Sequence, residues 1–171
     1  MAFFGNYDMT DQTQLVIVLN RMYASEIIAA EQYYNHGVAV QGIYSLQLQD
    51  MFFEHADDER KHAGMLKDHI MVMGGVLDNQ LTRMVMNNPT TDGRMDVQSS
   101  DVTSEMLNLD LTSEQTAIDA YTEIALAVKD TWPLTFTVVS AILADEYEHR
   151  HDLRNLLGPT ECFCDDSQDD A

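Results

Sequence analysis

The sequence contains few cysteines, and this scarcity already narrows the class of protein. Its two cysteines, Cys162 and Cys164, both lie near the C-terminal end, which argues against a disulfide framework and suits a reducing compartment. The longest uninterrupted apolar run, residues 15–19, is too short to cross a bilayer, and the first residues contain no secretory signal. We therefore expect a cytoplasmic protein that makes no use of a membrane.

Basic residues are also scarce, since 9 Lys and Arg stand against 29 Asp and Glu, for a net charge of −20. Nucleic acids and anionic membranes bind proteins through Lys and Arg that neutralise phosphate, so neither partner is expected. The acidic surplus has two compatible interpretations. It can form a solvated surface, as in a salt-tolerant organism, or an inner surface that gathers cations.

Strand-like alternation is missing, and four long segments instead have the periodicity of helices. They span about residues 11–41, 43–73, 101–129 and 133–158. Asp11 with Gln14 resembles a capping box, the pair Gly74 and Gly75 ends the second helix, and Pro133 starts the fourth. Short links join the first helix to the second and the third to the fourth, so each pair is expected to be an antiparallel hairpin.

The link between the second and third helices is long, at about residues 76–102. At roughly 3.3 Å per extended residue it can run along a whole bundle, and residues 76–88 carry enough apolar side chains for a short helix. The expected fold is all-α: a ferritin-like four-helix bundle of two antiparallel hairpins joined by a long crossover. We assign residues 1–158 to this bundle and residues 159–171 to an acidic, disordered tail.

The helices carry a repeated pairing of glutamate with histidine. Glu-x-x-His steps occur at residues 59–62, 146–149 and 148–151. Residues three apart share a helical face, so each step presents a carboxylate and an imidazole side by side. The last two steps overlap, and the helical faces separate them: Glu146 and His149 lie in the apolar stripe of the last helix, whereas Glu148 and His151 lie on a more polar face.

Each of the four helices carries one glutamate in its apolar stripe, and two of these glutamates are followed by a histidine. The inward set is Glu26, Glu59, His62, Glu114, Glu146 and His149. For any one of them, an exposed charge or a singly hydrogen-bonded core group is the simpler interpretation. Four buried carboxylates together would repel one another and lose their hydration, and two divalent cations remove both penalties. The sequence therefore predicts a carboxylate-bridged di-iron site.

Roughly residues 10–157 resemble the bacterioferritin and Dps-like branch of the ferritin-like superfamily, most clearly in the segments EIIAAEQY (26–33), DLTSEQ (110–115) and LADEYEH (143–149). The resemblance implies that the six inward residues bind two Fe ions per subunit, or Mn or Zn as substitutes. It further implies that Glu59 and Glu146 bridge the ions and that Tyr33 lies beside them and supplies a further electron. The implied function is ferroxidase activity, the oxidation of Fe(II) by O₂ or H₂O₂, with iron storage and protection from oxidative stress in a shell of identical subunits.

The sequence departs from bacterioferritin in ways that change these expectations. Arg60 follows Glu59 where bacterioferritins place a haem-binding methionine, so no haem is expected. Residues 159–171 are too short for the fifth helix of 24-subunit shells, and the long crossover resembles the Dps-like group, so a 12-mer is favoured over a 24-mer. The cysteine pair that this group often has near the site is absent here, as are the Lys-rich tails of Dps proper.

Two other functions use the same fold. A di-iron or di-manganese peroxidase or oxidase like rubrerythrin would not store iron, although the additional third-helix glutamate of rubrerythrin is Ala117 here. A DNA-compacting shell is disfavoured by the charge of −20. Among the remaining histidines, His55 is expected to be a hydrogen-bonded core residue, with an accessory iron site as the alternative, and His36 and His69 are expected to be similar. The Cys162/Cys164 pair is expected to be a reactive tail or a soft-metal ligand.

Overall fold

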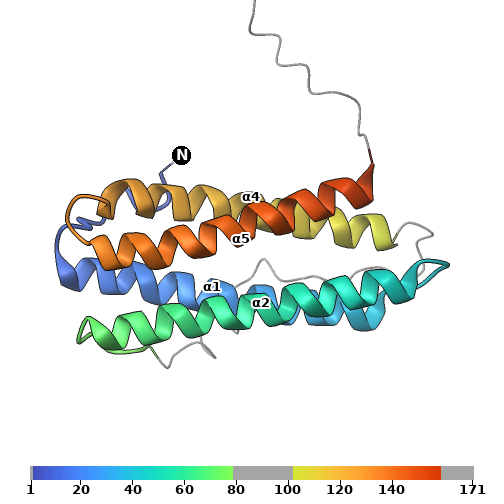
Figure 1. Ribbon diagram of the computed structural model, residues 1–171, viewed down its shortest axis with the longest axis horizontal. Coiled ribbons are helices and arrows are strands. Elements are labelled where there is room, and N and C mark those ends of the chain that lie inside the picture. The colour runs from blue at the N-terminus through green and yellow to red at the C-terminus, as the bar shows by residue number, and fades with distance from the viewer. Residues whose placement is uncertain (1, 79–101, 159–171) are drawn as a thin grey trace, which may run out of the picture.

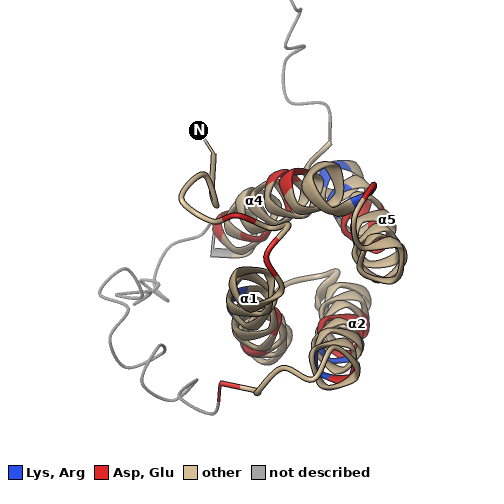
Figure 2. Cartoon of the chain, turned by 90° about the vertical axis from the view of Figure 1, so that its left-hand side faces the viewer, with Lys and Arg blue, Asp and Glu red and all other residues tan. Residues whose placement is uncertain are grey.

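The computed structural model describes residues 2–78 and 102–158. Its helices are α1 (Gln12–Ala39), α2 (Ser45–Val72), α4 (Val102–Val128) and α5 (Pro133–Leu157). They pair into two antiparallel hairpins, α1 with α2 and α4 with α5, which lie one above the other in Figure 1 and surround a common axis in Figure 2. Because the described residues contain no strand, the predicted all-α fold is confirmed. None of these helices is both long enough and apolar enough to span a membrane.

The connection between the hairpins is a crossover. In Figure 1, α2 ends at one end of the bundle and α4 begins at the other. The chain between them therefore has to travel the length of the bundle, as predicted. Residues 76–78, at the start of this connection, are not helical. The remainder of the short helix predicted over residues 76–88 lies outside the described residues, as does the tail with Cys162 and Cys164.

The first helix begins where the sequence predicts. The side chain of Asp11 accepts a hydrogen bond of 3.0 Å from the backbone N–H of Gln14, which is the usual role of an N-cap aspartate. The side chain of Gln14 accepts a bond from the N–H of Asp8 instead of that of Asp11. Only half of the predicted capping box therefore forms.

The second helix ends at its two glycines. Gly74 has a φ of +73°, and the N–H of Gly75 donates to the carbonyl of Ile70 at 2.9 Å. This is the Schellman arrangement, in which a residue in the left-handed region lets the chain reverse and satisfies the last carbonyls of the helix. Helix α5 starts at Pro133 as predicted, because a proline at the first helical position loses no hydrogen bond.

Apolar side chains fill the bundle in two clusters. One contains Leu15, Leu19, Met22, Leu66, Ile70, Ile124 and Ile142. The other contains Tyr33, Leu48, Phe52, Met106, Leu107 and Leu153. Between them along the helices lies a layer of buried charged residues. Leu156 continues the apolar stripe of the last helix in the sequence, and its burial was expected, but it is 46% exposed and borders an open hollow with Tyr44 and Leu48.

Candidate metal centre

The six residues predicted as ligands meet in the middle of the bundle, with one glutamate from each helix and one histidine each from α2 and α5. All six are at most 4% exposed. They form two groups whose ligand atoms lie within 4.8 Å of one another: Glu26, Glu59, His62 and Glu146, and Glu59, Glu114, Glu146 and His149. Glu59 and Glu146 belong to both groups, which is the placement that a bridging carboxylate requires.

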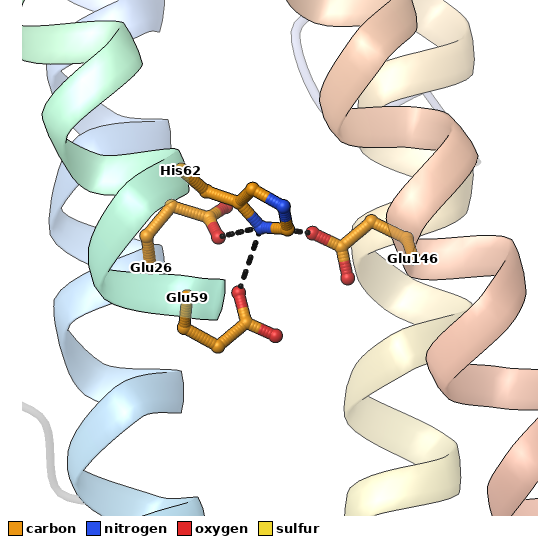
Figure 3. A group of neighbouring side chains, drawn as sticks. All are labelled: Glu26, Glu59, His62 and Glu146. Atoms are coloured by element: carbon orange, nitrogen blue, oxygen red, sulfur yellow. Dashed lines mark hydrogen bonds and ion pairs between the residues drawn. The ribbon is translucent and has the colours of Figure 1, made fainter. Parts of the chain in front are cut away.

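The first group surrounds one ring nitrogen of His62 (Figure 3). Its Nδ1 atom lies 3.2 Å from Oε2 of Glu59, 3.3 Å from Oε1 of Glu146 and 3.5 Å from Oε2 of Glu26. These carboxylates come from α2, α5 and α1, so the group draws on both hairpins. A nitrogen lone pair and three carboxylate oxygens around one point form a donor set typical of Fe, Mn or Zn.

The second group surrounds His149 in the same way. Its Nδ1 atom lies 3.3 Å from Oε1 of Glu59, 3.8 Å from Oε1 of Glu114 and 4.0 Å from Oε2 of Glu146. Here α4 supplies the carboxylate that α1 supplies around His62. The two groups are therefore related as two halves of one centre.

Several atoms of this centre lack the partners that buried polar atoms normally have. Within the described residues, Oε2 of Glu114, Oε1 of Glu146 and Nδ1 of His149 are buried and make no hydrogen bond. Such atoms are rare in folded proteins, because an unpaired buried polar group costs desolvation energy. Three of them in one cluster of acidic and imidazole ligands fit a pair of divalent metal ions.

The pKa values of three glutamates are displaced upward. Burial raises the pKa of Glu26 to about 8, and the charge of Glu59 adds to the rise. Burial likewise raises the pKa of Glu146 to about 7, while the neighbouring imidazole of His62 opposes the rise. The pKa of Glu114 lies well above its ordinary value, because of burial and the neighbouring Glu146. Without metal, this centre therefore retains protons at neutral pH.

The pKa values of Glu59 and the two histidines are shifted so that their charged forms are favoured: that of Glu59 is lowered and those of the histidines are raised. Burial would raise the pKa of Glu59, but the adjacent imidazoles of His149 and His62 outweigh it and lower the pKa. Burial would lower the pKa of both histidines, yet the surrounding carboxylates raise it. The raised pKa values of the histidines favour their protonated forms, and cations binding here have to displace these protons.

An aspartate stands behind each histidine on the side away from the glutamates. The Nε2 atom of His62 lies 3.1 Å from Asp145 of α5, and that of His149 lies 3.7 Å from Asp58 of α2. Each aspartate directly precedes a central glutamate and belongs to the hairpin opposite its histidine. Carboxylates in this position orient a metal-binding imidazole and increase its basicity.

Two tyrosines complete the surroundings, again across the hairpins. Tyr33 of α1 donates its hydroxyl hydrogen to Glu114 of α4, and Tyr121 of α4 donates to Glu26 of α1. Both rings are buried, and burial together with the accepting carboxylates raises their pKa well above the ordinary value. Tyr33 thus lies beside the centre as expected, and Tyr121 occupies the equivalent place in the other half.

Tyr121, Asp58 and Asp145 are site residues that the sequence reasoning missed. A signal for them exists as an internal repeat. Glu-x₆-Tyr occurs at residues 26–33 and 114–121, and Asp-Glu-x-x-His occurs at residues 58–62 and 145–149. Each hairpin therefore carries the same two motifs in the same order. Aligning the two hairpins would have identified all three residues.

The other histidines divide into three kinds. Glu148 and His151 are exposed, so the overlapping Glu-x-x-His step does not join the centre. His36 and His69 are hydrogen-bonded in the core as expected, to Asp110 at 2.7 Å and to Thr135 at 2.8 Å. His55 is buried as well, but it makes no hydrogen bond within the described residues. The expectation of a hydrogen-bonded core residue was wrong for His55, because its ring stacks on His149 instead.

Two hollows approach the centre from different faces. A cavity of about 90 Å³ between α1 and α4 reaches Glu26, Glu114 and both shared glutamates, and it is lined further out by Ser25, Ala29, Gln32, Ser113 and Ala117. Ser25 is exposed, so this cavity leads from the surface toward the centre. A second hollow, of about 200 Å³, lies between α2 and α5.

A four-helix bundle with two Glu-x-x-His helices and two further inward glutamates defines a class, the carboxylate-bridged di-metal bundles. The chain belongs to the ferritin-like family, since residues 18–163 match the model of the ferritin-like domain.

Two solved structures are similar to the chain. The bacterioferritin-related protein of Bacteroides fragilis, described as a dodecameric thioferritin, shares 31% identity over 86% of each chain, with a TM-score of 0.71. A ferritin-like, diiron-carboxylate protein of Bacillus anthracis shares 26% identity over 86% of this chain and 97% of that one, with a TM-score of 0.65. Among curated protein sequences, no match is found.

Proposed function

We propose that this protein is a ferroxidase that stores iron: it oxidises Fe(II) with O₂ or H₂O₂ at its centre and keeps the ferric product in a shell of identical subunits. The observation that carries the proposal is the convergence of four buried glutamates and two buried histidines, several of whose atoms lack partners. The ferritin-like family and the diiron-carboxylate relative support it.

In this proposal the six residues divide into three roles. Glu26 and Glu114 each bind one Fe(II), Glu59 and Glu146 bridge both, and His62 and His149 each anchor one ion. Four carboxylates match two divalent cations in charge, and their oxygens favour the harder Fe(III) product. Mn and Zn fit the same donors as substitutes.

The reaction requires electrons from iron and protons from the protein or water. Two Fe(II) ions supply the two electrons that, with two protons, convert H₂O₂ into two water molecules; with O₂ the same electrons and protons give H₂O₂. Glu114 and Glu26, the two glutamates that each bind a single ion in this proposal, are held in position by hydrogen bonds from the hydroxyl groups of Tyr33 and Tyr121. We assign Tyr33 the further role of supplying an additional electron, while its hydroxyl proton passes along the hydrogen bond to Glu114.

The cavity between α1 and α4 is the proposed entrance for Fe(II) and the oxidant, because it joins exposed Ser25 to the glutamates. Ala117 lines this cavity where a rubrerythrin-like peroxidase would be expected to supply another glutamate. The rubrerythrin-like alternative therefore gains no support from this position.

A shell of twelve subunits is the proposed assembly. The similar Bacteroides fragilis protein is dodecameric. Large apolar side chains stand out on this chain around the turn between α1 and α2: Ile43, Tyr44 and Leu46 are 90%, 68% and 72% exposed. Contacts between subunits would cover such residues. The proposed location is the cytoplasm, where a reducing environment maintains Fe(II).

Anaerobic loading with Fe(II), followed by O₂ or H₂O₂, tests the proposal when iron per chain is counted. We expect uptake of many more than two irons per chain. Light scattering should give the protein shell a mass twelve times that of the 19.4 kDa chain. Saturation at two irons in a small oligomer would refute storage and favour the peroxidase or oxidase alternative. Absence of rapid oxidation with either oxidant would refute the ferroxidase itself.

A further inference from the structure

The internal repeat that relates the two hairpins is broken around one of its two tyrosines. The register that aligns Tyr33 with Tyr121 also aligns three polar residues with three apolar ones: Gln32 with Ala120, His36 with Ile124 and Asp110 with Met22. The three apolar residues are buried in the same cluster as Tyr121. Polar groups therefore lie near Tyr33 at positions whose counterparts near Tyr121 are apolar.

The three polar residues form a buried network between α1 and α4. Asp110 is fully buried, and each of its carboxylate oxygens has a partner. Its Oδ1 accepts a hydrogen bond of 2.7 Å from the amide of Gln32, and its Oδ2 lies 2.7 Å from Nδ1 of His36. Apolar residues in these places would avoid the cost of burying a carboxylate, and the other half of the repeat shows that the bundle accommodates them. Stability of the fold therefore does not account for Asp110.

This network adjoins the hydrogen bond between Tyr33 and Glu114. Gln32 directly precedes Tyr33 on α1, and Asp110 lies one turn before Glu114 on α4. The negative charge of Asp110 acts on the phenol: after burial and the charge of Glu114, it contributes to the raised pKa of Tyr33. Asp110 is thus a second carboxylate beside the tyrosine, and it makes no hydrogen bond with it.

Asp110 differs from the carboxylates near Tyr121 because it does not belong to the metal centre. The carboxylates that act most strongly on Tyr121 are those of Glu26 and Glu146, and both belong to the groups that can hold a metal ion, whereas Asp110 belongs to neither group. Divalent cations would compensate the glutamates and leave the charge of Asp110 in place. The ring of His55 meets Tyr33 edge-on at 5.1 Å, but it adds no charge at neutral pH, because burial lowers its pKa to about 4.

We propose that Asp110, held by Gln32 and His36, makes Tyr33 the more readily oxidised of the two tyrosines. When Tyr33 loses an electron and its hydroxyl proton moves to Glu114, a neutral tyrosyl radical remains and the pair gains one positive charge, which the carboxylate of Asp110 stabilises. All three network residues act through Tyr33 and are positioning residues. The use of this electron rests on the proposed function: H₂O₂ takes up two electrons and two protons to give two water molecules, with one electron from Tyr33 and the other from Fe(II).

One-electron oxidation of the zinc-loaded, full-length protein tests this inference without any oxidation of iron. Azide radicals from pulse radiolysis oxidise tyrosines, and EPR of frozen samples records the tyrosyl radical that persists after radicals on exposed tyrosines have decayed by coupling. Tyr33→Phe and Tyr121→Phe assign the signal. Asp110→Asn and the control Asp119→Asn, which removes an exposed aspartate from the same helix, are then made in the Tyr121→Phe protein, so that the persistent signal reports Tyr33 alone.

We expect a persistent radical that Tyr33→Phe abolishes and Tyr121→Phe retains. Asp110→Asn should lower it at least about tenfold, because the stabilising charge is gone, whereas Asp119→Asn should leave it unchanged. An undiminished signal in Asp110→Asn would overturn the proposal. So would a signal that Tyr121→Phe abolishes, or the absence of a persistent radical in the unaltered protein.

The repeat supplies a second variant in case Asp110→Asn does not fold. Gln32→Ala, His36→Ile and Asp110→Met together give Tyr33 the residues that surround Tyr121, and this triple variant should lose the Tyr33 signal to the same extent while its circular dichroism stays that of a helical bundle. A folded triple variant with the full signal would overturn the proposal. A Tyr33 radical that depends on Asp110, in a protein that oxidises no Fe(II), would refute the ferroxidase and leave this inference standing.

Discussion

At the scale of single residues, chemically identical glutamates behave differently because their neighbours differ. Glu59 touches both histidines and has a lowered pKa, whereas Glu26 and Glu146 have theirs raised to about 8 and about 7. Burial acts on all of them, and the positive partners decide the sign. In the metal-free protein, protons bound to the glutamates thus neutralise part of the negative charge that bound cations would neutralise.

These shifts predict that the metal-free protein loses stability as the pH rises. A glutamate in the unfolded chain titrates near pH 4.3, so between about pH 5 and 8 the folded state holds protons on Glu26 and Glu146 that the unfolded state has lost. This contribution is complete below pH 4.3 and disappears as the pH passes the folded values. The raised pKa values of His62 and His149 act in the same direction.

Urea unfolding of the metal-free protein at pH 6 and pH 8.5 measures this effect. We expect a lower unfolding free energy at the higher pH, and a flatter dependence in Glu26→Gln, which cannot titrate. The same unfolding free energy at both values of pH would contradict the assignment.

Replacing Glu114 with Ala removes one ligand of the His149 group. Outer partners of metal ligands contribute about 10–100-fold to affinity or activity, so loss of a direct ligand is expected to lower the initial rate of Fe(II) oxidation at least about 100-fold. Stopped-flow absorbance measures this rate. The control Glu105→Ala removes an exposed glutamate of the same helix and should leave the rate unaltered. An unchanged rate in Glu114→Ala would refute the ligand assignment.

Asp145 tests the role of the residues behind the histidines. Its carboxylate lies 3.1 Å from Nε2 of His62, and its side chain is 55% exposed, so Asp145→Ala should fold normally. The freed imidazole loses its orientation, and we predict about 10–100-fold weaker binding of the first two Co²⁺ ions by calorimetry. Asp68→Ala, at an exposed position of α2, is the matched control and should bind as the unaltered chain does. Equal affinity in the two variants would remove Asp145 from the site.

At the scale of helices, the sequence was sufficient for the elements and for the faces that they bury. Helical periodicity with local end signals located all four helices to within about two residues, because both depend on neighbours along the chain. Helical periodicity also predicted correctly that the six inward residues lie together, and their role as ligands is still a prediction. Tyr121 and Asp145 were missed because their partners belong to the other hairpin, and the pairing depends on how the hairpins dock.

Two helical glycines should respond oppositely to the same substitution. A Cβ at Gly64 of α2 meets nothing within 4 Å, so Gly64→Ala should raise the unfolding free energy by about 0.5–1 kcal/mol, as alanine does in helices. A Cβ at Gly37 of α1 would lie 2.6 Å from Cε1 of Phe53, so Gly37→Ala should lower it by about 1–3 kcal/mol. Denaturant titration of both variants measures the difference. A gain for Gly37→Ala would mean that α1 and α2 do not pack as closely as the structure has them.

At the scale of the whole molecule, acidic side chains are spread over all of the helices and greatly outnumber basic ones (Figure 2). A net charge of −20 surrounds the protein with a field that attracts cations and repels polyanions. The field therefore favours the approach of divalent cations, and it opposes the DNA-compacting function of some ferritin-like shells.

We accordingly predict no retardation of duplex DNA by this protein at physiological salt, in an electrophoretic assay at micromolar protein. Lowering the ionic strength should not produce binding either, since the interaction between like charges only becomes more repulsive. A shifted band that disappears with added salt would reveal a local basic surface and revive the DNA-compacting alternative.

The reciprocal pairing of the hairpins has a consequence for how chains can combine. Tyr33 and Tyr121, like Asp58 and Asp145, each find their partner on the opposite hairpin. A single hairpin thus holds one partner of each of these four contacts, and all four form only where the two unlike hairpins meet. Two chains that exchanged their second hairpins would rebuild two centres with the same residues in the same places. Hairpin exchange between neighbouring subunits would therefore keep the residues of each centre together, while each chain would contribute one hairpin to each of two bundles.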